Sequence, residues 1–203
     1  MNIYTNTSPK DIVRNAFYNN LSGITEVSIA SPFFSYSDLV EELLNRDCFV
    51  RLIVRLGPAT SPDALQRLIN HKDIHIRYFT SPAFHSKLYI FGDKASLVGS
   101  ANLTQSGMNS NREICVEIPR EDEAFDSLVL LFNSYWSQAD PLDQKALEKY
   151  ARLYDTYSSK AESSFEENIK KQFGDVVPAE GIEVGKAKPS KEKVFLSSYS
   201  RTY

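Results

Sequence analysis

The sequence predicts an α/β protein with a mixed, largely parallel β-sheet that is covered by helices on both faces. In the first half of the chain, short segments rich in β-branched residues alternate with segments of helical period. Such alternation is typical of βαβ units, in which helices connect parallel strands. Apolar residues make up 42% of the 203 residues and charged residues 24%, which are ordinary values for a globular domain.

Capping residues and turn signals place the elements of the first half. Ser8 is a candidate helix cap with Pro9 at the first helical position, so we expect a helix over residues 8–20. Later strands end at Pro- or Gly-containing turns, and the helices between them begin beside serines. In chain order we expect a strand over 26–30, a helix over 37–45, a strand over 49–56, a helix over 62–70 and a strand over 74–79.

The second half changes rhythm, because its apolar runs lie closer together. Gly92-Asp93 separates two strands expected over 86–91 and 96–98, and this pair is typical of a tight turn. A further strand is expected over 112–118, followed by helices over 121–136 and 141–157. From residue 159 the chain is polar without clear periodicity. We therefore expect a catalytic domain over 1–158 and a polar tail or linker over 159–203.

The composition excludes some classes of protein. The net charge of −3 argues against a generally basic protein that coats nucleic acid, but it allows a local basic cleft. No apolar run approaches the roughly 20 residues that span a bilayer, and the first residues do not resemble a secretion signal. Cys48 and Cys115 are expected to be reduced thiols. The sequence thus indicates a cytoplasmic protein with no membrane contact.

One segment, residues 85–113, gathers polar side chains at a spacing of two. His85 and Lys87 are expected on the same face of a strand, and Ser100 and Asn102 show the same spacing at the end of the next one. An imidazole is a nucleophile near neutral pH, an ammonium group neutralises phosphoryl oxygens, and an amide and a hydroxyl can hold a phosphate by hydrogen bonds. The pattern predicts a site that binds and attacks a phosphate.

Two further features fit such a site. Glu113 is expected to accept a proton from the second ring nitrogen of His85, which would select the tautomer and stabilise the imidazolium. A short helix is expected to begin within residues 104–106, with its backbone N–H groups facing the anion. His71 and His75 are four residues apart across an apparent turn, and no ligand spacing surrounds them, so we expect neither a metal nor a cofactor.

Several of these residues also have plainer interpretations. Ser100 and Asn102 can form a turn, and Glu113 can be a solvent-facing strand residue. An aromatic group follows the first main strand, where its rings would either stack on bases or pack in the core; it consists of Phe33, Phe34 and Tyr36. Arg51 and Arg55 lie at even spacing on a strand, and the sequence does not decide whether they face a helix or the cleft.

The motif resembles that of the phospholipase D superfamily. That family is marked by His-x-Lys, a following Gly-Ser and a nearby Asn, and the corresponding positions here are His85, Lys87, Gly99, Ser100 and Asn102. The resemblance is strongest over residues 85–118. It implies a phospholipase D-like α/β fold and a metal-independent phosphodiesterase.

Two more positions bear on the resemblance. Glu113 matches a downstream acidic position that supports the histidine in the nuclease branch of the family. The aspartate of the family motif is replaced by Gly92, with Asp93 one place later as a candidate supporting residue. We expect Asp93 to be a turn residue first.

The resemblance is closest to the single-motif branch that includes metal-independent restriction endonucleases. It implies that DNA is cleaved through a covalent phosphohistidine. Because that mechanism uses two histidines and the chain has one motif, it implies a homodimer in which two copies of His85 share one site. It leaves room for a separate DNA-recognition partner. The alternatives are a phospholipase D-type lipid hydrolase or transferase and a catalytically inactive module that binds nucleic acid.

Overall fold

The computed structural model describes residues 2–156, so the tail or linker expected over 159–203 lies outside the described residues. Eight strands form one sheet in the order β1-β7-β6-β5-β2-β3-β4-β8. Their bounds are β1 Ile3–Tyr4, β2 Glu26–Ala30, β3 Phe49–Arg55, β4 Ile74–Phe79, β5 Leu88–Phe91, β6 Ala95–Gly99, β7 Cys115–Pro119 and β8 Asp140–Pro141.

The sheet is mixed, which confirms the expected fold class, but it is not largely parallel. Among the named strands, only β2, β3 and β4 pair in parallel. The other neighbouring pairs are antiparallel. The connection between β5 and β6 shows the reason: it comprises residues 92–94, with Gly92 at a φ of 54°. Parallel neighbours need a crossover of roughly a dozen residues, so this connection permits only a hairpin.

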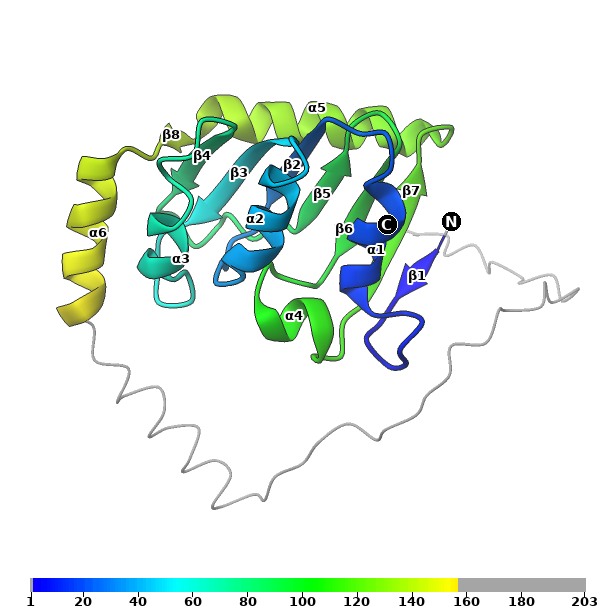
Figure 1. Cartoon of the computed structure of the whole chain (residues 1–203), viewed down its shortest axis with the longest axis horizontal. Coiled ribbons are helices and arrows are strands. Elements are labelled where there is room, and N and C mark those ends of the chain that lie inside the picture. The colour runs from blue at the N-terminus through cyan, green and yellow to red at the C-terminus, as the bar shows by residue number, and fades with distance from the viewer. Residues whose placement is uncertain (1, 157–203) are drawn as a thin grey trace, which may run out of the picture.

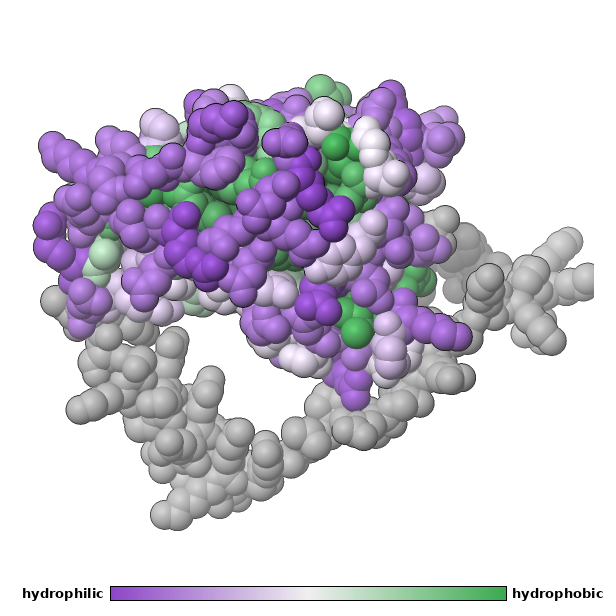
Figure 2. Space-filling view, in the orientation of Figure 1, coloured by the Kyte–Doolittle hydropathy of each residue, from purple (hydrophilic) through white to green (hydrophobic). Residues whose placement is uncertain are grey.

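Helices cover both faces of the sheet, as expected (Figure 1). Their bounds are α1 Val13–Asn20, α2 Ser37–Leu44, α3 Pro62–Gln66, α4 Gln105–Asn109, α5 Glu123–Gln138 and α6 Gln144–Thr156. Strand alternation gives each face its own core. Tyr89 and Phe91 join the core on the side of α1 and α2, whereas Leu88 and Ile90 pack with α5. Figure 2 shows a largely hydrophilic outer surface with hydrophobic groups in the gaps between elements.

The first helix begins later than the capping signal predicts. It starts at Val13 rather than near Ser8, because polar side chains hold the preceding residues in a loop. The Asp11 carboxylate accepts hydrogen bonds from the Ser8 N–H at 2.8 Å and the Thr5 hydroxyl at 2.8 Å. The Asn6 side-chain oxygen accepts from the Val13 N–H at 2.8 Å and satisfies the first turn of α1.

Other boundaries follow the sequence more closely. The bounds of β2 and β4 are as predicted, and Ser61 caps α3 by accepting a hydrogen bond from the Ala64 N–H. Residues 67–70 lie beyond α3, which is shorter than predicted. The two-residue strands β1 and β8 were not predicted, because a strand of two residues has no readable period. No helix within residues 2–156 is long and apolar enough to cross a membrane.

A close approach between β6 and β7 depends on Gly99. It pairs with Cys115. A Cβ atom on Gly99 would lie 2.1 Å from the Ile114 carbonyl oxygen and 2.6 Å from the Cys115 Cα, both of which are backbone atoms. Only a hydrogen atom fits there. The glycine therefore lets the start of β7 lie directly against the end of β6.

We expect Gly99→Ala to destabilise the protein by about 2 kcal/mol, within the range for inserting a methyl group into packed surroundings. Urea denaturation followed by circular dichroism measures the free energy of unfolding. Gly57→Ala is the matched control, because its Cβ would meet nothing nearer than the Arg55 side chain at 3.8 Å. Equal losses in the two variants would contradict the close-approach argument.

Candidate active site

The predicted site residues other than Asp93 gather at one edge of the sheet, which we call the motif edge. It comprises the ends of β2, β3 and β6 and the beginnings of β5 and β7. The register brings these together, since Leu88 pairs with both Ala30 of β2 and Val98 of β6. In Figure 1 the motif edge is the lower edge of the sheet, on the side of α4.

His85 and Lys87 meet at this edge. They lie in an extended segment just before β5 rather than inside a strand, since β5 begins at Leu88. The Lys87 Nζ lies 2.9 Å from the His85 Nδ1 and donates to the His85 carbonyl oxygen at 2.9 Å. Lys87 is 8% exposed, whereas His85 is exposed to solvent. The expected pairing of imidazole and ammonium is therefore present.

The charges around this pair favour a neutral imidazole. The positive charge of Lys87 lowers the pKa of His85 below its ordinary value of 6.5, and burial and Arg55 act in the same direction. Burial lowers the pKa of Lys87 itself; Arg55 adds to this effect and Glu113 opposes it. A neutral ring at neutral pH is the nucleophilic form of histidine.

Glu113 bonds to a different partner from the one expected. Its carboxylate accepts a short hydrogen bond from the Ser100 hydroxyl, which in turn accepts from the Ile114 N–H at 2.9 Å. Among the described residues no hydrogen bond joins Glu113 to His85, whose ring is occupied by Lys87. The register explains this, because the pairing of Gly99 with Cys115 continues to Ser100 and Ile114, which are joined by a backbone hydrogen bond, and Glu113 is the residue next to Ile114. Glu113 acts on the pair through its charge on Lys87.

Asn102 is held rigidly by its neighbours. The Tyr89 hydroxyl donates to the Ala101 carbonyl oxygen at 2.8 Å, and the Leu103 N–H donates to the Ser31 hydroxyl at 2.8 Å. The side-chain oxygen of Asn102 is buried and has no hydrogen-bond partner in the described part of the chain. A buried polar atom without a partner raises the free energy of the folded state unless water or a ligand satisfies it.

The short helix expected after Asn102 is present as α4. Its cap is the Thr104 hydroxyl, which accepts from the Gly107 N–H at 3.0 Å. The Thr104 N–H donates to the Asn102 carbonyl oxygen at 2.8 Å. These two N–H groups are used within the turn and are not available to an anion, whereas anion binding by the rest of the turn stays a prediction.

Two residues that the sequence left undecided border the site. The Phe33 ring lies edge-on to the His85 ring, with centroids 5.7 Å apart. The central guanidinium carbon of Arg55 lies 4.9 Å from the centroid of the same Phe33 ring. The sequence signal for these two residues was an aromatic group after one strand and two arginines on another. The strand order is needed to show which of them lie beside His85.

The neighbouring candidates have structural roles. Phe34 is fully buried in the core, and the Tyr36 hydroxyl accepts a hydrogen bond from Arg14 at 3.3 Å. Arg51 faces α5, where it donates to the Asn133 side chain at 3.0 Å and pairs with Glu26 at 2.8 Å. Cys48 and Cys115 are free thiols, as expected.

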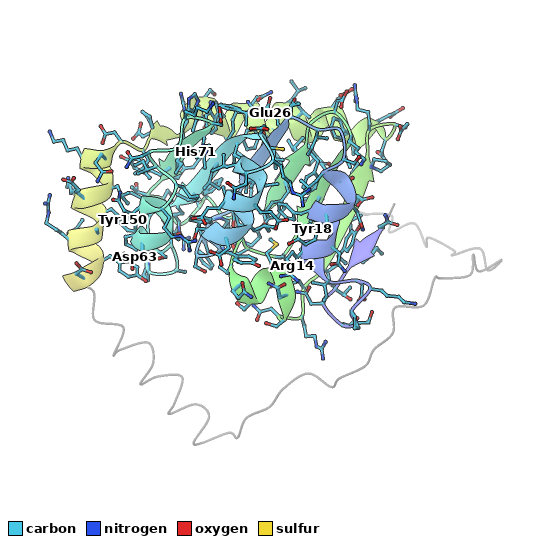
Figure 3. The ribbon with its side chains drawn as sticks, viewed as in Figure 1. Arg14, Tyr18, Glu26, Asp63, His71 and Tyr150 are labelled. Carbon is cyan, nitrogen blue, oxygen red and sulfur yellow. The ribbon has the colours of Figure 1, made fainter. Side chains whose placement is uncertain are left out.

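Asp93 does not reach the site. It is exposed in the turn between β5 and β6, at the edge of the sheet opposite to the motif edge. The neighbouring Gly92 N–H donates to the carbonyl oxygen of Glu26, which Figure 3 labels at that opposite edge. The prediction of a supporting role for Asp93 at the site is therefore wrong in this structure, and its turn position is confirmed.

The remaining histidines lie elsewhere. The His71 Nδ1 accepts from the Asp73 N–H at 3.2 Å, and the His75 ring packs on Phe49 at 5.0 Å. Within residues 2–156, no three His, Cys, Asp or Glu side chains are grouped so that they could hold a metal ion.

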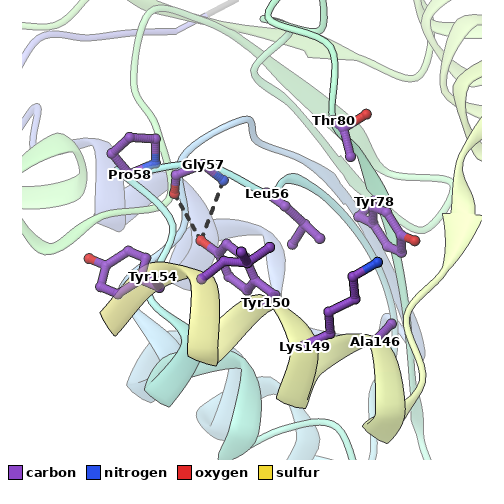
Figure 4. Close-up of a pocket in the computed structure, with 10 residues that line it drawn as sticks. Leu56, Gly57, Pro58, Tyr78, Thr80, Ala146, Lys149, Tyr150 and Tyr154 are labelled. Atoms are coloured by element: carbon purple, nitrogen blue, oxygen red, sulfur yellow. Dashed lines mark hydrogen bonds between the residues drawn. The ribbon is translucent and has the colours of Figure 1, made fainter. Parts of the chain in front are cut away.

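A separate pocket of about 390 Å³ lies between α6 and the ends of β3 and β4 (Figure 4). Tyr78, Tyr150 and Tyr154 line it together with Lys149. The Tyr150 hydroxyl fixes α6 to the loop after β3, because it lies within hydrogen-bond distance of the Gly57 and Thr60 carbonyl oxygens and can donate to either. None of the predicted catalytic residues lines this pocket. We therefore place the candidate site at His85 and Lys87, where reactive groups converge.

Known proteins resemble this chain in sequence pattern and fold. Residues 21–136 match the family described as cardiolipin synthase, PLD-like domain. The structure is similar to that of Nuc from Salmonella typhimurium, a phospholipase D family member, with a TM-score of 0.59, 20% identity, and coverage of 70% of this chain and 97% of Nuc. No curated protein matched the sequence.

Two further solved structures are similar. NucT from Helicobacter pylori has a TM-score of 0.56 and 16% identity, with 70% of this chain and 98% of NucT covered. Phosphatidylserine synthase from Haemophilus influenzae has a TM-score of 0.56 and 13% identity, with 84% of this chain and 45% of the synthase covered. At these identities the likeness shows the fold.

We expect Lys87→Met to raise the pKa of His85 toward 6.5, because the ammonium charge is the largest cause of its lowering. NMR titration of the imidazole protons measures this directly, since the chain has three histidines. Lys94→Met, in the turn at the opposite edge, is the control. An unchanged His85 titration in Lys87→Met would disprove the electrostatic coupling.

Proposed function

We propose that this chain, which belongs to the phospholipase D superfamily of enzymes, is a phosphodiesterase that cleaves nucleic acid, with DNA as the first substrate to test. The observation that carries the proposal is the contact at the motif edge between an exposed imidazole and a buried ammonium group, 2.9 Å apart. The first supplies a nucleophile, and the second supplies a positive charge for phosphoryl oxygens.

The proposed reaction has two displacements at phosphorus. A neutral His85 nitrogen forms a P–N bond while the bond to the leaving oxygen breaks, and that oxygen takes the electron pair and a proton from a general acid. Water then attacks the phosphohistidine, its proton goes to the same group acting as base, and the P–N bond breaks. Lys87 neutralises the phosphoryl oxygens, and Asn102 and Ser100 help to position them.

Substrate binding would also free the His85 ring nitrogen that Lys87 occupies in the free site. An ammonium group only donates, so the His85 Nδ1 accepts from Lys87 and the ring proton lies on Nε2. When a phosphate draws the Lys87 ammonium away, Nδ1 can take the proton and Nε2 becomes the nucleophile. Glu113 is close enough to influence Lys87 by its charge and would stabilise this rearrangement.

The general acid must come from outside this set of residues. His71 and His75 lie at the beginning of β4, and β4 runs parallel to β3, so they are at the edge opposite to His85. We therefore infer a homodimer in which His85 of a second chain faces the first across a two-fold axis. Ile114, which is 67% exposed beside Glu113, supplies an apolar contact for such pairing.

The comparisons support nucleic acid more than lipid. This chain covers nearly the whole of Nuc and NucT but less than half of the phosphatidylserine synthase. The extent of this chain thus matches that of Nuc and NucT rather than that of the lipid synthase, and a unit with one motif needs a second copy to supply two histidines. A phospholipid remains the alternative substrate in the test below, and a separate DNA-recognition partner would supply any sequence specificity.

Hydrolysis of single-stranded DNA should persist in excess EDTA, because the proposed catalytic groups are all side chains. His85→Ala should abolish turnover, and Lys87→Ala should lower kcat by a factor of about 100 or more, as the loss of one transition-state charge partner does. Asp93→Ala should cost much less. The same preparations are assayed on phospholipid vesicles. Activity that EDTA removes and Mg²⁺ restores would refute the mechanism, and activity on lipid alone would refute the substrate.

Mixing experiments test the shared site. Wild-type and His85→Ala chains are unfolded together and refolded at varied ratios. Activity should fall roughly as the square of the wild-type fraction, because mixed dimers lack one of the two histidines. A linear fall, or an active monomer in analytical ultracentrifugation, would show that each chain holds a complete site.

A further inference from the structure

We propose that Arg55 and Phe33 form a second phosphate subsite beside His85, which binds a phosphate adjacent to the scissile one. The subsite would make the enzyme selective for a polynucleotide over an isolated phosphodiester. This inference rests on the proposed function, since it assigns a substrate class to the same site.

The first observation is that the charge of Arg55 is not balanced by a carboxylate. The ion pairs of the described residues involve Arg46, Arg51, Arg67 and Arg120 but not Arg55. Arg51 lies four residues earlier on the same strand, and Glu26 balances its charge at 2.8 Å. The hydrogen bond that Arg55 makes is to the Pro82 carbonyl oxygen, at a long 3.4 Å.

The second observation is the place of the guanidinium group. Sheet order puts β2 between β5 and β3, with Phe33 in the loop that follows β2. Neighbouring strands are about 4.8 Å apart, so the end of β3 lies roughly 10 Å from the start of β5. The Phe33 ring lies in this interval, with His85 at 5.7 Å and Arg55 at 4.9 Å. The ring thus lies between the guanidinium and the reacting group, and the Lys87 Nζ is 6.0 Å from the same ring centroid.

The third observation is electrostatic. Arg55 lowers the pKa of both His85 and Lys87, so its charge is felt across the motif edge. Lys87 thus feels the charge of a second cation, Arg55, and of one carboxylate, Glu113, in a chain whose net charge is −3. Like charges held together disfavour the empty site, and an anion with more than one negative charge relieves that repulsion. Guanidinium groups are well suited to phosphate because they donate two parallel hydrogen bonds.

A substrate with a single phosphate can occupy only the position at Lys87 and His85. A polynucleotide that binds there also presents its next phosphate, and the Arg55 guanidinium is the available cation at the adjoining end of β3. Phe33 packs under the guanidinium and keeps it directed along the motif edge. Selection between substrate classes thus follows from the number of phosphates that bind at once.

The test compares Arg55→Gln with the wild type in the full chain, on a single-stranded oligonucleotide and on bis(p-nitrophenyl) phosphate. The loss in kcat/KM should be about tenfold or more greater for the oligonucleotide, the scale of one charge-assisted hydrogen bond. The slope of log kcat/KM against log salt concentration should become shallower by about 0.7, the value for one phosphate contact on a single strand. Arg55→Lys should retain the steeper slope.

Arg120→Gln is the matched control, because Arg120 follows β7 at the opposite edge and pairs with Asp126. Arg120→Gln should leave kcat/KM unchanged on both substrates. Equal losses on the two substrates in Arg55→Gln would assign Arg55 to the scissile phosphate and overturn the proposal. An unchanged kcat/KM for the oligonucleotide would overturn it as well.

A binding measurement separates this inference from the proposed function. Fluorescence anisotropy compares the affinity of His85→Ala and His85→Ala/Arg55→Gln for a labelled oligonucleotide across a range of salt concentrations. If the wild type hydrolyses neither substrate, the proposed function fails, yet weaker and less salt-dependent binding in the double variant would still support the subsite. Identical binding by the two proteins would eliminate it.

Discussion

The antiparallel register between β5 and its two neighbours is the constraint on which the site depends. Because Leu88 pairs with Ala30 and with Val98, the residues before β5 lie beside the residues that follow β2 and β6. The parallel pairing of β2 and β3 adds Arg55 to the same edge. A parallel β5 would instead start at the edge that now carries Asp93, and His85 would be a strand length from Asn102. The convergence of these side chains at one edge is thus a consequence of strand direction.

Electrostatic strain is built into this edge. Lys87 is buried enough that its charged form is disfavoured, and Arg55 adds to the cost. The hydroxyl of Ser100 binds the Glu113 carboxylate, so this carboxylate is held near Lys87 but does not form an ion pair with it. The buried oxygen of Asn102 is a further unsatisfied group. Charged and polar groups in unfavourable surroundings gather at functional sites, so these features support the proposed one.

The sequence predicted the parts of this structure that depend on local signals. The bounds of β2 and β4, the cap at Ser61 and the turn at Gly92 are all written in nearby residues. The spacing of His85 and Lys87 predicted that their side chains lie on the same face, where they are in contact, although the strand begins later. The start of α1 was wrong because the side chains of Asp11 and Asn6 replace the cap expected at Ser8.

The rest depends on which strands are neighbours, and a single sequence does not contain that information. The partner of Glu113 follows from the pairing of β6 with β7. The different environments of Arg51 and Arg55 follow from their places on β3, since Arg51 lies against α5 and Arg55 lies at the motif edge.

The proposed dimer would have one further consequence for substrate binding. Its two-fold axis would place both copies of Lys87 at the centre and one Arg55 on each side, so a strand crossing the centre would meet cations in both directions from the scissile phosphate. A polynucleotide strand has a 5′-to-3′ direction, whereas the two-fold symmetric surface of the dimer has none. One Arg55 would therefore meet a phosphate on the 5′ side of the scissile phosphate, and the other would meet one on the 3′ side. The orientation of the strand would then decide which His85 attacks and which one protonates the leaving oxygen.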